Sequence, residues 1–299
     1  MKKVLIDEVG PRDGLQNIAE FIPTEKKIEL IRAILDSGVS MMNLTSFVSP
    51  KAIPQLADAR AVAEAILPAY PEVSFNALIP NLKGAQFAVE AGFREVVNVV
   101  SVSETHNLRN INRSHEQSFQ ALAEIRERYP DLKLIVGLAT SFGCPFEGET
   151  SLEKLMSMVD RVAALGLNSI QLSDTIGVAY PTQVASFVDA VRAAYPEMEI
   201  GIHIHDTRNM GVINTYVAIE HGVDYIDSSV GGLGGCPFAP GASGNTSTED
   251  LVYMLDKCGF ETGIDFQKIL AAARLAESVV KGGIFSGHQL KIKTSGSCC

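Results

Sequence analysis

The chain has 299 residues, 46% of them hydrophobic, and this length is enough to bury a large core. Its formal net charge of -10 and its pI near 5.1 argue against nucleic acid or an anionic membrane as a partner, because an acidic surface repels phosphate groups. The first apolar run ends at Asp7 and is too short for a signal peptide. No stretch approaches the roughly 20 apolar residues that span a bilayer. We therefore expect a cytoplasmic protein.

The five cysteines are too few and too scattered for a disulfide framework. Cys298 and Cys299 close the chain in a tail rich in Ser and Gly. A reduced tail is the simpler expectation, and an intersubunit disulfide is the alternative.

Short apolar runs rich in β-branched residues alternate with amphipathic stretches along the chain. The expected strands span residues 4–9, 41–47, 73–79, 96–102, 134–139, 170–176, 200–205 and 225–230. The expected helices between and after them span residues 24–35, 59–67, 82–91, 116–128, 152–164, 183–194, 211–221 and 250–258. Glycines stand where helix ends need them, at Gly38, Gly92, Gly166 and Gly222.

Eight strand–helix repeats predict an α/β protein with a closed (β/α)8 TIM barrel, and a doubly wound open sheet is the alternative. Strands buried on both faces explain why most runs are apolar rather than alternating. We expect one catalytic domain over residues 1–299, in which residues 262–299 form a C-terminal extension with a helix over 266–280 and a tail. The chemistry of such barrels lies at the carboxyl ends of the strands, so polar residues there are the candidates for a site.

The first expected strand ends in Arg12 and Asp13, between Pro11 and Gly14. Adjacent opposite charges can form a surface ion pair of little value. At a barrel mouth a second interpretation is stronger. Asp13 would be an oxygen ligand for a metal, and Arg12 a fixed cation for a developing oxyanion.

The second and sixth strands also end in polar residues. Asn43 and Ser46 close the second strand, and Gln171 and Asp174 close the sixth. Asp174 is expected to be an inward carboxylate with an electrostatic or catalytic role.

The seventh strand ends in His203-Ile204-His205-Asp206. Residues two apart on a strand face the same side, so both imidazoles are expected to point into the barrel. Two neighbouring imidazoles suit one divalent metal. The alternative is a pair of core histidines whose hydrogen bonds are satisfied.

The eighth strand runs into a loop over residues 231–245 that contains six glycines. Such a loop lets the backbone approach a ligand closely or move as a lid. Cys236 within it is either a small inert hydrophobe or an acid–base group. Asn245, at its end, is expected to offer a carbonyl oxygen to the metal.

Together these segments resemble the 3-hydroxy-3-methylglutaryl-CoA lyase family. The matching motifs are GPRDGLQN (10–17), TSFVSPK (45–51), PNLKG (80–84), GCPFEG (143–148), SDTIGV (173–178), HIHDT (203–207), GGLGGCPFAPGASGN (231–245) and TEDLVYML (248–255). The glycine-rich cysteine loop is the most specific of them.

The resemblance implies a retro-Claisen cleavage of an acyl-CoA that carries a tertiary 3-hydroxyl. It implies that Mg²⁺ or Mn²⁺ is held by four residues, Asp13, His203, His205 and Asn245. Arg12 would steady the enolate oxygen, Asp174 would take part in acid–base steps, and Cys236 would protonate the enolate carbon. It also implies a homodimer.

The chain departs from the family pattern at several strand ends. Asn43 stands where the lyases carry a glutamate, Gln171 where a serine is usual, and Arg208 where a tyrosine follows the HDT motif. We expect the substrate to be contacted by Gln16, Asn43, Ser46, Gln171 and Arg208, with Arg208 meeting a carboxylate, phosphate or CoA group. Because the metal set is intact, the resemblance supports the reaction class more strongly than the acyl group, and the ion stays open.

Two other functions remain alternatives. One is a condensing enzyme of the isopropylmalate or homocitrate synthase kind. Those enzymes typically carry a further C-terminal region, which we do not expect here because the sequence ends about 70 residues after the eighth expected strand. The other is a metal-binding pseudoenzyme, for which Asn43 is the support. A biotin-dependent carboxyltransferase is disfavoured because residues 134–139 contain no lysine to carbamylate.

Overall fold

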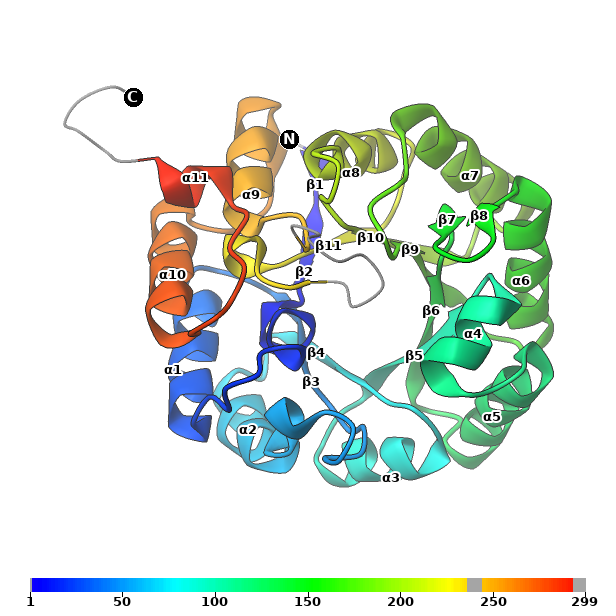
Figure 1. The fold of residues 1–299 in the computed structure, drawn as a ribbon, viewed down its shortest axis with the longest axis horizontal. Helices are drawn as coiled ribbons and strands as arrows, with labels where there is room; N and C mark the ends of the chain where they lie inside the picture. Colours follow the sequence, from blue (N-terminus) through cyan, green and yellow to red (C-terminus); the bar gives the residue numbers. More distant parts are fainter. Residues whose placement is uncertain (1, 236–243, 293–299) are drawn as a thin grey trace.

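The computed structural model describes residues 2–235 and 244–292. Eight parallel strands close into a barrel, and helices surround it (Figure 1). The barrel strands are β2 (Leu5–Glu8), β3 (Met41–Ser46), β4 (Ser74–Leu78), β5 (Glu95–Ser101), β6 (Lys133–Ala139), β9 (Ser169–Asp174), β10 (Glu199–Ile204) and β11 (Tyr225–Ser228). The closed barrel confirms the predicted TIM-barrel class, and the open-sheet alternative is wrong.

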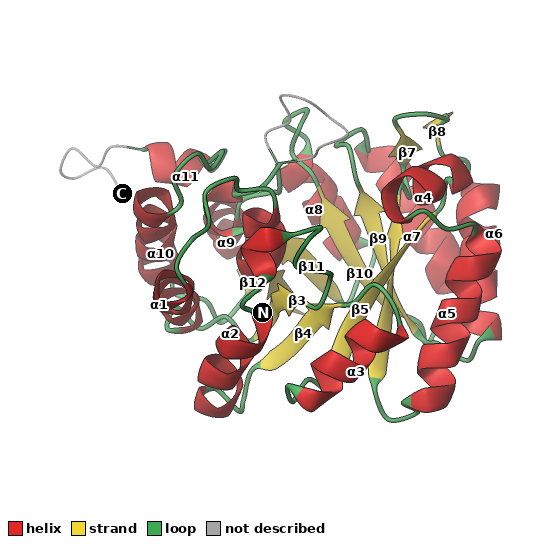
Figure 2. Ribbon diagram, turned by 60° about the horizontal axis from the view of Figure 1, so that its bottom comes forward, coloured by secondary structure: helices red, strands yellow, loops and turns green. Residues whose placement is uncertain are grey.

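Helices follow the strands and cover the outer face of the barrel (Figure 2). They are α1 (Thr24–Leu35), α2 (Ala59–Ile66), α3 (Leu82–Glu90), α5 (His115–Arg128), α6 (Leu152–Ala164), α7 (Pro181–Ala194), α8 (Gly211–Glu220) and α9 (Thr248–Lys257). The expected C-terminal helix is α10 (Phe266–Val279), and it packs against α1 and α9. A short helix α11 (His288–Lys291) follows it.

Several short elements are absent from the sequence-based prediction. Helix α4 (Glu104–Ile111) follows β5. A hairpin of two strands with two residues each, β7 (Gly143–Cys144) and β8 (Gly148–Glu149), follows β6. Strand β1 (Lys2–Lys3) pairs with β12 (Phe260–Glu261) outside the barrel. The polar sequence of α4 has no apolar stripe, which is the signal that would have predicted it.

The barrel interior is unusually polar beneath the carboxyl ends of its strands. Asp7, Asn43, Asn76, Gln171 and Asp227 lie on β2, β3, β4, β9 and β11, and all five side chains are buried. The flanking residues on the same strands, such as Ile6, Met42 and Ile226, belong to the hydrophobic core. Buried polar groups require hydrogen-bond partners. These side chains bond to one another and to Arg12 and His203 at the barrel mouth.

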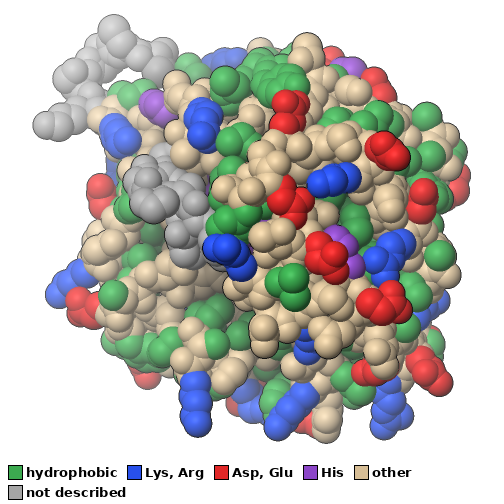
Figure 3. Space-filling model, turned by 45° about the vertical axis from the view of Figure 1, so that its right-hand side comes forward, with side chains coloured by type: hydrophobic (Ala, Val, Ile, Leu, Met, Phe, Trp, Pro, Cys, Tyr) green, Lys and Arg blue, Asp and Glu red, His purple; other side chains and the backbone are tan. Residues whose placement is uncertain are grey.

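Acidic and basic side chains are interspersed over the face of the molecule shown in Figure 3. Within the described part of the chain, none of the helices is both long and apolar enough to cross a bilayer.

Candidate active site

Arg12 and Asp13 lie on a single π-helical turn, η1 (Gly10–Gly14), which follows β2 after Val9. The backbone N–H groups of Arg12 and Asp13 both donate to the carbonyl of Val9, at 3.1 and 2.7 Å. Arg12 Nη1 lies 2.5 Å from Asp13 Oδ1, and both side chains are about nine-tenths buried. The pair is therefore a buried ion pair fixed to the end of a barrel strand, and the interpretation as an exposed surface pair is wrong.

His203 and His205 lie at the end of β10 with their ring centroids 5.0 Å apart. One potential ligand atom from each of Asp13, His203 and His205 lies within 4.8 Å of the others, and all three residues are buried. His203 Nδ1 is 2.9 Å from Asp227 Oδ2, so its Nε2 is the nitrogen left for a metal. A carboxylate that holds the far nitrogen of a ligating imidazole is the usual support of such a ligand.

Asn245 joins this cluster from the start of the segment that leads into α9. Its Nδ2 donates to Asp13 Oδ2 at 2.8 Å and to the carbonyl of Leu233 at 3.1 Å. Its Oδ1 is buried and has no hydrogen-bond partner among the described residues, and the same is true of His205 Nδ1. Unpartnered buried acceptors are costly unless something binds them, so the donor set fits a divalent cation.

The protonation states agree with a metal site. Burial raises the pKa of Asp13, but the charge of Arg12, the two histidines and the hydrogen bond from Asn245 together outweigh burial and lower that pKa to about 2. Burial lowers the pKa of His205 to about 4 and also lowers the pKa of His203. At neutral pH the cluster therefore offers an ionised carboxylate and two neutral imidazoles, which are the ligating forms of these groups.

A cavity of about 590 Å³ opens at the same mouth. Its lining includes Arg12, Asp13, Gln16, Gln171, His203 and His205 from the predicted site, and apolar residues such as Ile53, Leu78 and Val99. Asn81, Asn110 and Arg113 add further polar groups to the wall. A mostly apolar cleft with a few convergent polar groups is the usual form of a small-molecule site.

Gln16 and Gln171 are two predicted substrate contacts that line this cavity. Gln16 Nε2 donates to Asp13 Oδ1 at 2.7 Å. Gln171 Nε2 donates to both oxygens of Asp227, each at 2.9 Å. Gln16 thus bonds to a carboxylate of the cluster, and Gln171 bonds to the carboxylate that contacts His203.

The other three predicted contacts are placed differently, and none of them is among the described residues that line the cavity. Ser46 accepts from the backbone N–H of Val48. Arg208 is exposed, and its Nη1 donates to the carbonyls of Ile176 and Gly177 at 3.1 and 2.8 Å. Asn43 lies behind Arg12 and accepts from its Nε at 2.9 Å.

Asp174 is fully buried, and each of its oxygens accepts from a backbone N–H, of Val178 at 2.9 Å and of Ala179 at 3.0 Å. Burial raises the pKa of Asp174 to about 6. Asp174 alternates along β9 with Ser173, which lines the cavity, and is not itself among the described residues that line it. Its inward direction and its part in proton transfer stay predictions. Cys236, Cys298 and Cys299 lie outside the described residues.

Asp227 and Asn76 support the site but are absent from the sequence-based set. Each is a polar residue inside an apolar strand, which is the signal that could have identified them. Burial raises the pKa of Asp227 well above its usual value, although the charge of Arg12 and the hydrogen bond from Gln171 lower it.

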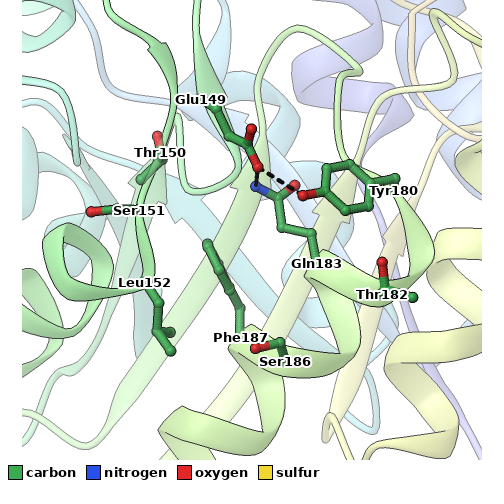
Figure 4. A pocket seen from close by; sticks show the side chains of 9 residues that line it. All are labelled: Glu149, Thr150, Ser151, Leu152, Tyr180, Thr182, Gln183, Ser186 and Phe187. Atoms are coloured by element: carbon green, nitrogen blue, oxygen red, sulfur yellow. Dashed lines mark hydrogen bonds between the residues drawn. The ribbon is translucent and has the colours of Figure 1, made fainter.

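A separate hollow of about 550 Å³ lies outside the barrel, where residues before and at the start of α6 face α7 (Figure 4). Glu149 accepts there from Tyr180 Oη at 2.7 Å and from Gln183 Nε2 at 3.4 Å. The hollow shares no lining residue with the barrel mouth, so the chemistry described above does not extend to it.

Comparison with known proteins places this site in a family. The sequence profile of the HMGL-like family matches residues 3–276. The chain is 42% identical over 278 residues to the hydroxymethylglutaryl-CoA lyase YngG of Bacillus subtilis, covering 92% of this chain and 93% of that protein. It is 43% identical over 273 residues to the human mitochondrial hydroxymethylglutaryl-CoA lyase, covering 91% of this chain and 84% of that protein.

Solved structures agree with the sequence comparison. An HMG-CoA lyase from Acinetobacter baumannii in complex with coenzyme A and 3-methylmalate superimposes with a TM-score of 0.92 at 40% identity, over 99% of this chain and 98% of that chain. The carboxyl transferase domain of Rhizobium etli pyruvate carboxylase has a TM-score of 0.72 at 18% identity, over 93% of this chain and 47% of that chain, and shows the shared fold alone. The chain belongs to the HMGL-like family, as its sequence motifs predicted.

Proposed function

We propose that this protein is a metal-dependent carbon–carbon lyase that cleaves 3-hydroxy-3-methylglutaryl-CoA, or a closely related 3-hydroxy acyl-CoA, to acetyl-CoA and a 3-oxo acid. The observation that carries the proposal is the buried group of Asp13, His203 and His205 beside the fixed guanidinium of Arg12. The lyases named above, at 42 and 43% identity over most of the chain, support the substrate.

The reaction removes the proton of the 3-hydroxyl and breaks the C2–C3 bond. C3 becomes a ketone, and the electron pair passes to the thioester as an enolate, which then takes a proton at carbon. Mg²⁺ or Mn²⁺ held by Asp13, His203, His205 and Asn245 would polarise a substrate oxygen and lower the pKa of a hydroxyl.

Arg12 is suited to stabilise the enolate oxygen. Asp13 and Asn43 fix two edges of its guanidinium, so the charge needs no reorganisation when negative charge develops on the substrate. Gln16 holds the carboxylate of Asp13, and Asp227 holds the ring of His203. Asp174 and Cys236 are proposed for proton transfer from the family resemblance.

The test is acetyl-CoA release from 3-hydroxy-3-methylglutaryl-CoA by the purified protein, stripped with a chelator and then supplied with Mg²⁺ or Mn²⁺. We expect release that depends on the ion. A panel of other 3-hydroxy-3-alkyl acyl-CoAs would identify the preferred acyl group. Acetyl-CoA consumption in the presence of a 2-oxo acid would instead establish the condensing alternative. Metal binding without turnover of any substrate would establish the pseudoenzyme.

The single catalytic domain, the homodimer and the cytoplasmic location stay predictions. Sedimentation of the purified protein tests the dimer.

A further inference from the structure

A series of hydrogen bonds runs from the barrel interior to Arg12. Asn76 Nδ2 donates to Asp7 Oδ2 at 2.9 Å, and Asn43 Nδ2 donates to Asn76 Oδ1. Asn43 Oδ1 in turn accepts from Arg12 Nε at 2.9 Å. All four side chains are buried, and those of Asn43 and Asn76 are at most 2% exposed.

The direction of this series is fixed by Arg12. A guanidinium can only donate, so the Asn43 side chain must turn its oxygen toward Arg12 and its NH2 group toward Asn76. Asn76 must then present its own oxygen to Asn43 and its NH2 group to Asp7. Neither amide can flip without placing two donors or two acceptors together in a buried environment.

Three neighbouring barrel strands carry the series, and the β3–β4 register shifts just after Asn43. Asn43 and Asn76 are register partners on the adjacent strands β3 and β4. Asp7 lies on β2, which pairs with the other side of β3. Side chains carried by paired strands hold their geometry better than side chains carried by loops.

Arg12 is therefore held along two directions. Its Nε is bound by Asn43 and its Nη1 by Asp13, and Arg12 also lines the cavity. Within the described part of the chain these contacts use two of its five N–H groups, which leaves the others for a bound anion. Both amides are neutral, so Asp13 is the anion in direct contact with the guanidinium.

We propose that Asn43 and Asn76 are positioning residues that orient Arg12 for the oxyanion of the substrate. This inference rests on the proposed function. Asn43 is not among the described residues that line the cavity, so it acts through Arg12 rather than by touching the substrate. The series also explains why an amide at position 43 is compatible with catalysis: a carboxylate there could accept from Arg12 but could not donate to Asn76.

The first measurement needs no turnover. The exchange rate of the Arg12 Nε–H with solvent is followed by NMR in the wild type and in Asn76→Ala, which keeps Asn43 but removes its partner. We expect exchange to become about tenfold faster or more, because the hydrogen bond to Arg12 opens more often. Asn43→Ser, which is too short to bridge Arg12 and Asn76, is the second variant if Asn76→Ala does not fold.

Ser74→Ala is the matched control, because Ser74 begins the same strand β4 and its hydroxyl donates to Glu95 rather than to the series. Arg12 Nε–H exchange in Asn76→Ala and Asn43→Ser that equals exchange in Ser74→Ala would overturn the proposal.

The second measurement is the kinetics of acyl-CoA cleavage. We expect Asn76→Ala to lower kcat by about tenfold to a hundredfold with little change in KM, since a misplaced Arg12 weakens stabilisation of the transition state more than binding of the substrate. A change in KM alone would contradict a positioning role. If the wild type cleaves no acyl-CoA, the proposed function is wrong. Faster Arg12 Nε–H exchange in the variants would then still establish the hydrogen-bonded series.

Discussion

Asn245 Nδ2 donates to Asp13 Oδ2 at 2.8 Å, although 232 positions separate the two residues in the sequence. The bond joins the loop after the first barrel strand to the segment after the last one. It uses the donor side of the Asn245 amide and leaves the oxygen without a partner among the described residues. This orientation of the amide is the one that the proposed role of Asn245 as a metal ligand requires.

The first prediction concerns His205, a proposed metal ligand. His205→Ala should reduce both the bound metal and the turnover, the latter by about 100-fold or more, because no other group can take the place of the imidazole. Metal content of the purified protein and acetyl-CoA release check it. His221→Ala is the matched control, since His221 is half-exposed and pairs with Asp189 on the surface. Equal metal content in the two variants would contradict the site.

The second prediction concerns the support of a ligand. Asp227→Ala should weaken metal affinity by about 10- to 100-fold, because His203 loses the carboxylate that orients its ring. Titration of the chelator-stripped protein with Mn²⁺ measures the affinity. Asp189→Ala removes a comparable contact to His221 far from the cavity and should leave the affinity as in the wild type.

The third prediction is a dependence of stability on pH. Glu249 is fully buried, its Oε2 accepts from the N–H of Gly231 at 2.9 Å, and burial raises its pKa from 4.5 to about 7. A raised carboxyl pKa means that the folded protein holds the proton more tightly than the unfolded chain. The contribution of Glu249 to the free energy of unfolding is therefore complete below pH 4.5. It is lost as pH rises through 7, by at most about 3 kcal/mol.

Glu249→Gln should remove this part of the pH dependence, so the variant gains stability relative to the wild type between pH 5 and pH 8. Urea unfolding at several pH values measures it. A difference in stability that stays constant with pH would show that Glu249 is already ionised in the folded protein throughout this range.

The fourth prediction concerns Arg208. The structure ties its side chain to the carbonyls of Ile176 and Gly177, so Arg208→Ala should destabilise the protein by about 1 kcal/mol and leave KM for the acyl-CoA nearly unchanged. Steady-state kinetics and thermal unfolding separate the two effects. A rise in KM of about tenfold or more would instead support the sequence-based prediction that Arg208 contacts the substrate.

The fold was predictable because its signals are local. Apolar runs and amphipathic stretches locate the barrel strands and the main helices, and Gly38, Gly92, Gly166 and Gly222 all have the positive φ expected after a helix end. Helix α4 was missed because its buried residues include His106 and Asn107, and polar residues carry no periodic hydrophobic signal.

The site was predictable in part. Residues at strand ends identified Arg12, Asp13, His203 and His205, because a parallel barrel brings all its strand ends to one mouth. Side-chain direction was harder. Whether Arg208 faces the cavity or a neighbouring loop, and whether Asn43 touches substrate or Arg12, depends on hydrogen-bond partners from distant strands. Asp227 and Asn76 were missed for the same reason.

The pairing of β11 with β2 means that the first and last strands meet only when the whole chain has folded. Asp13 belongs to the first strand–helix unit, the two histidines to the seventh, and Asn245 to the eighth. No contiguous part of the barrel that ends before the eighth unit can assemble this set. With the proposed ligand set, metal affinity would be coupled to barrel closure, and a bound ion would stabilise the closed barrel in proportion to the logarithm of its concentration over its dissociation constant.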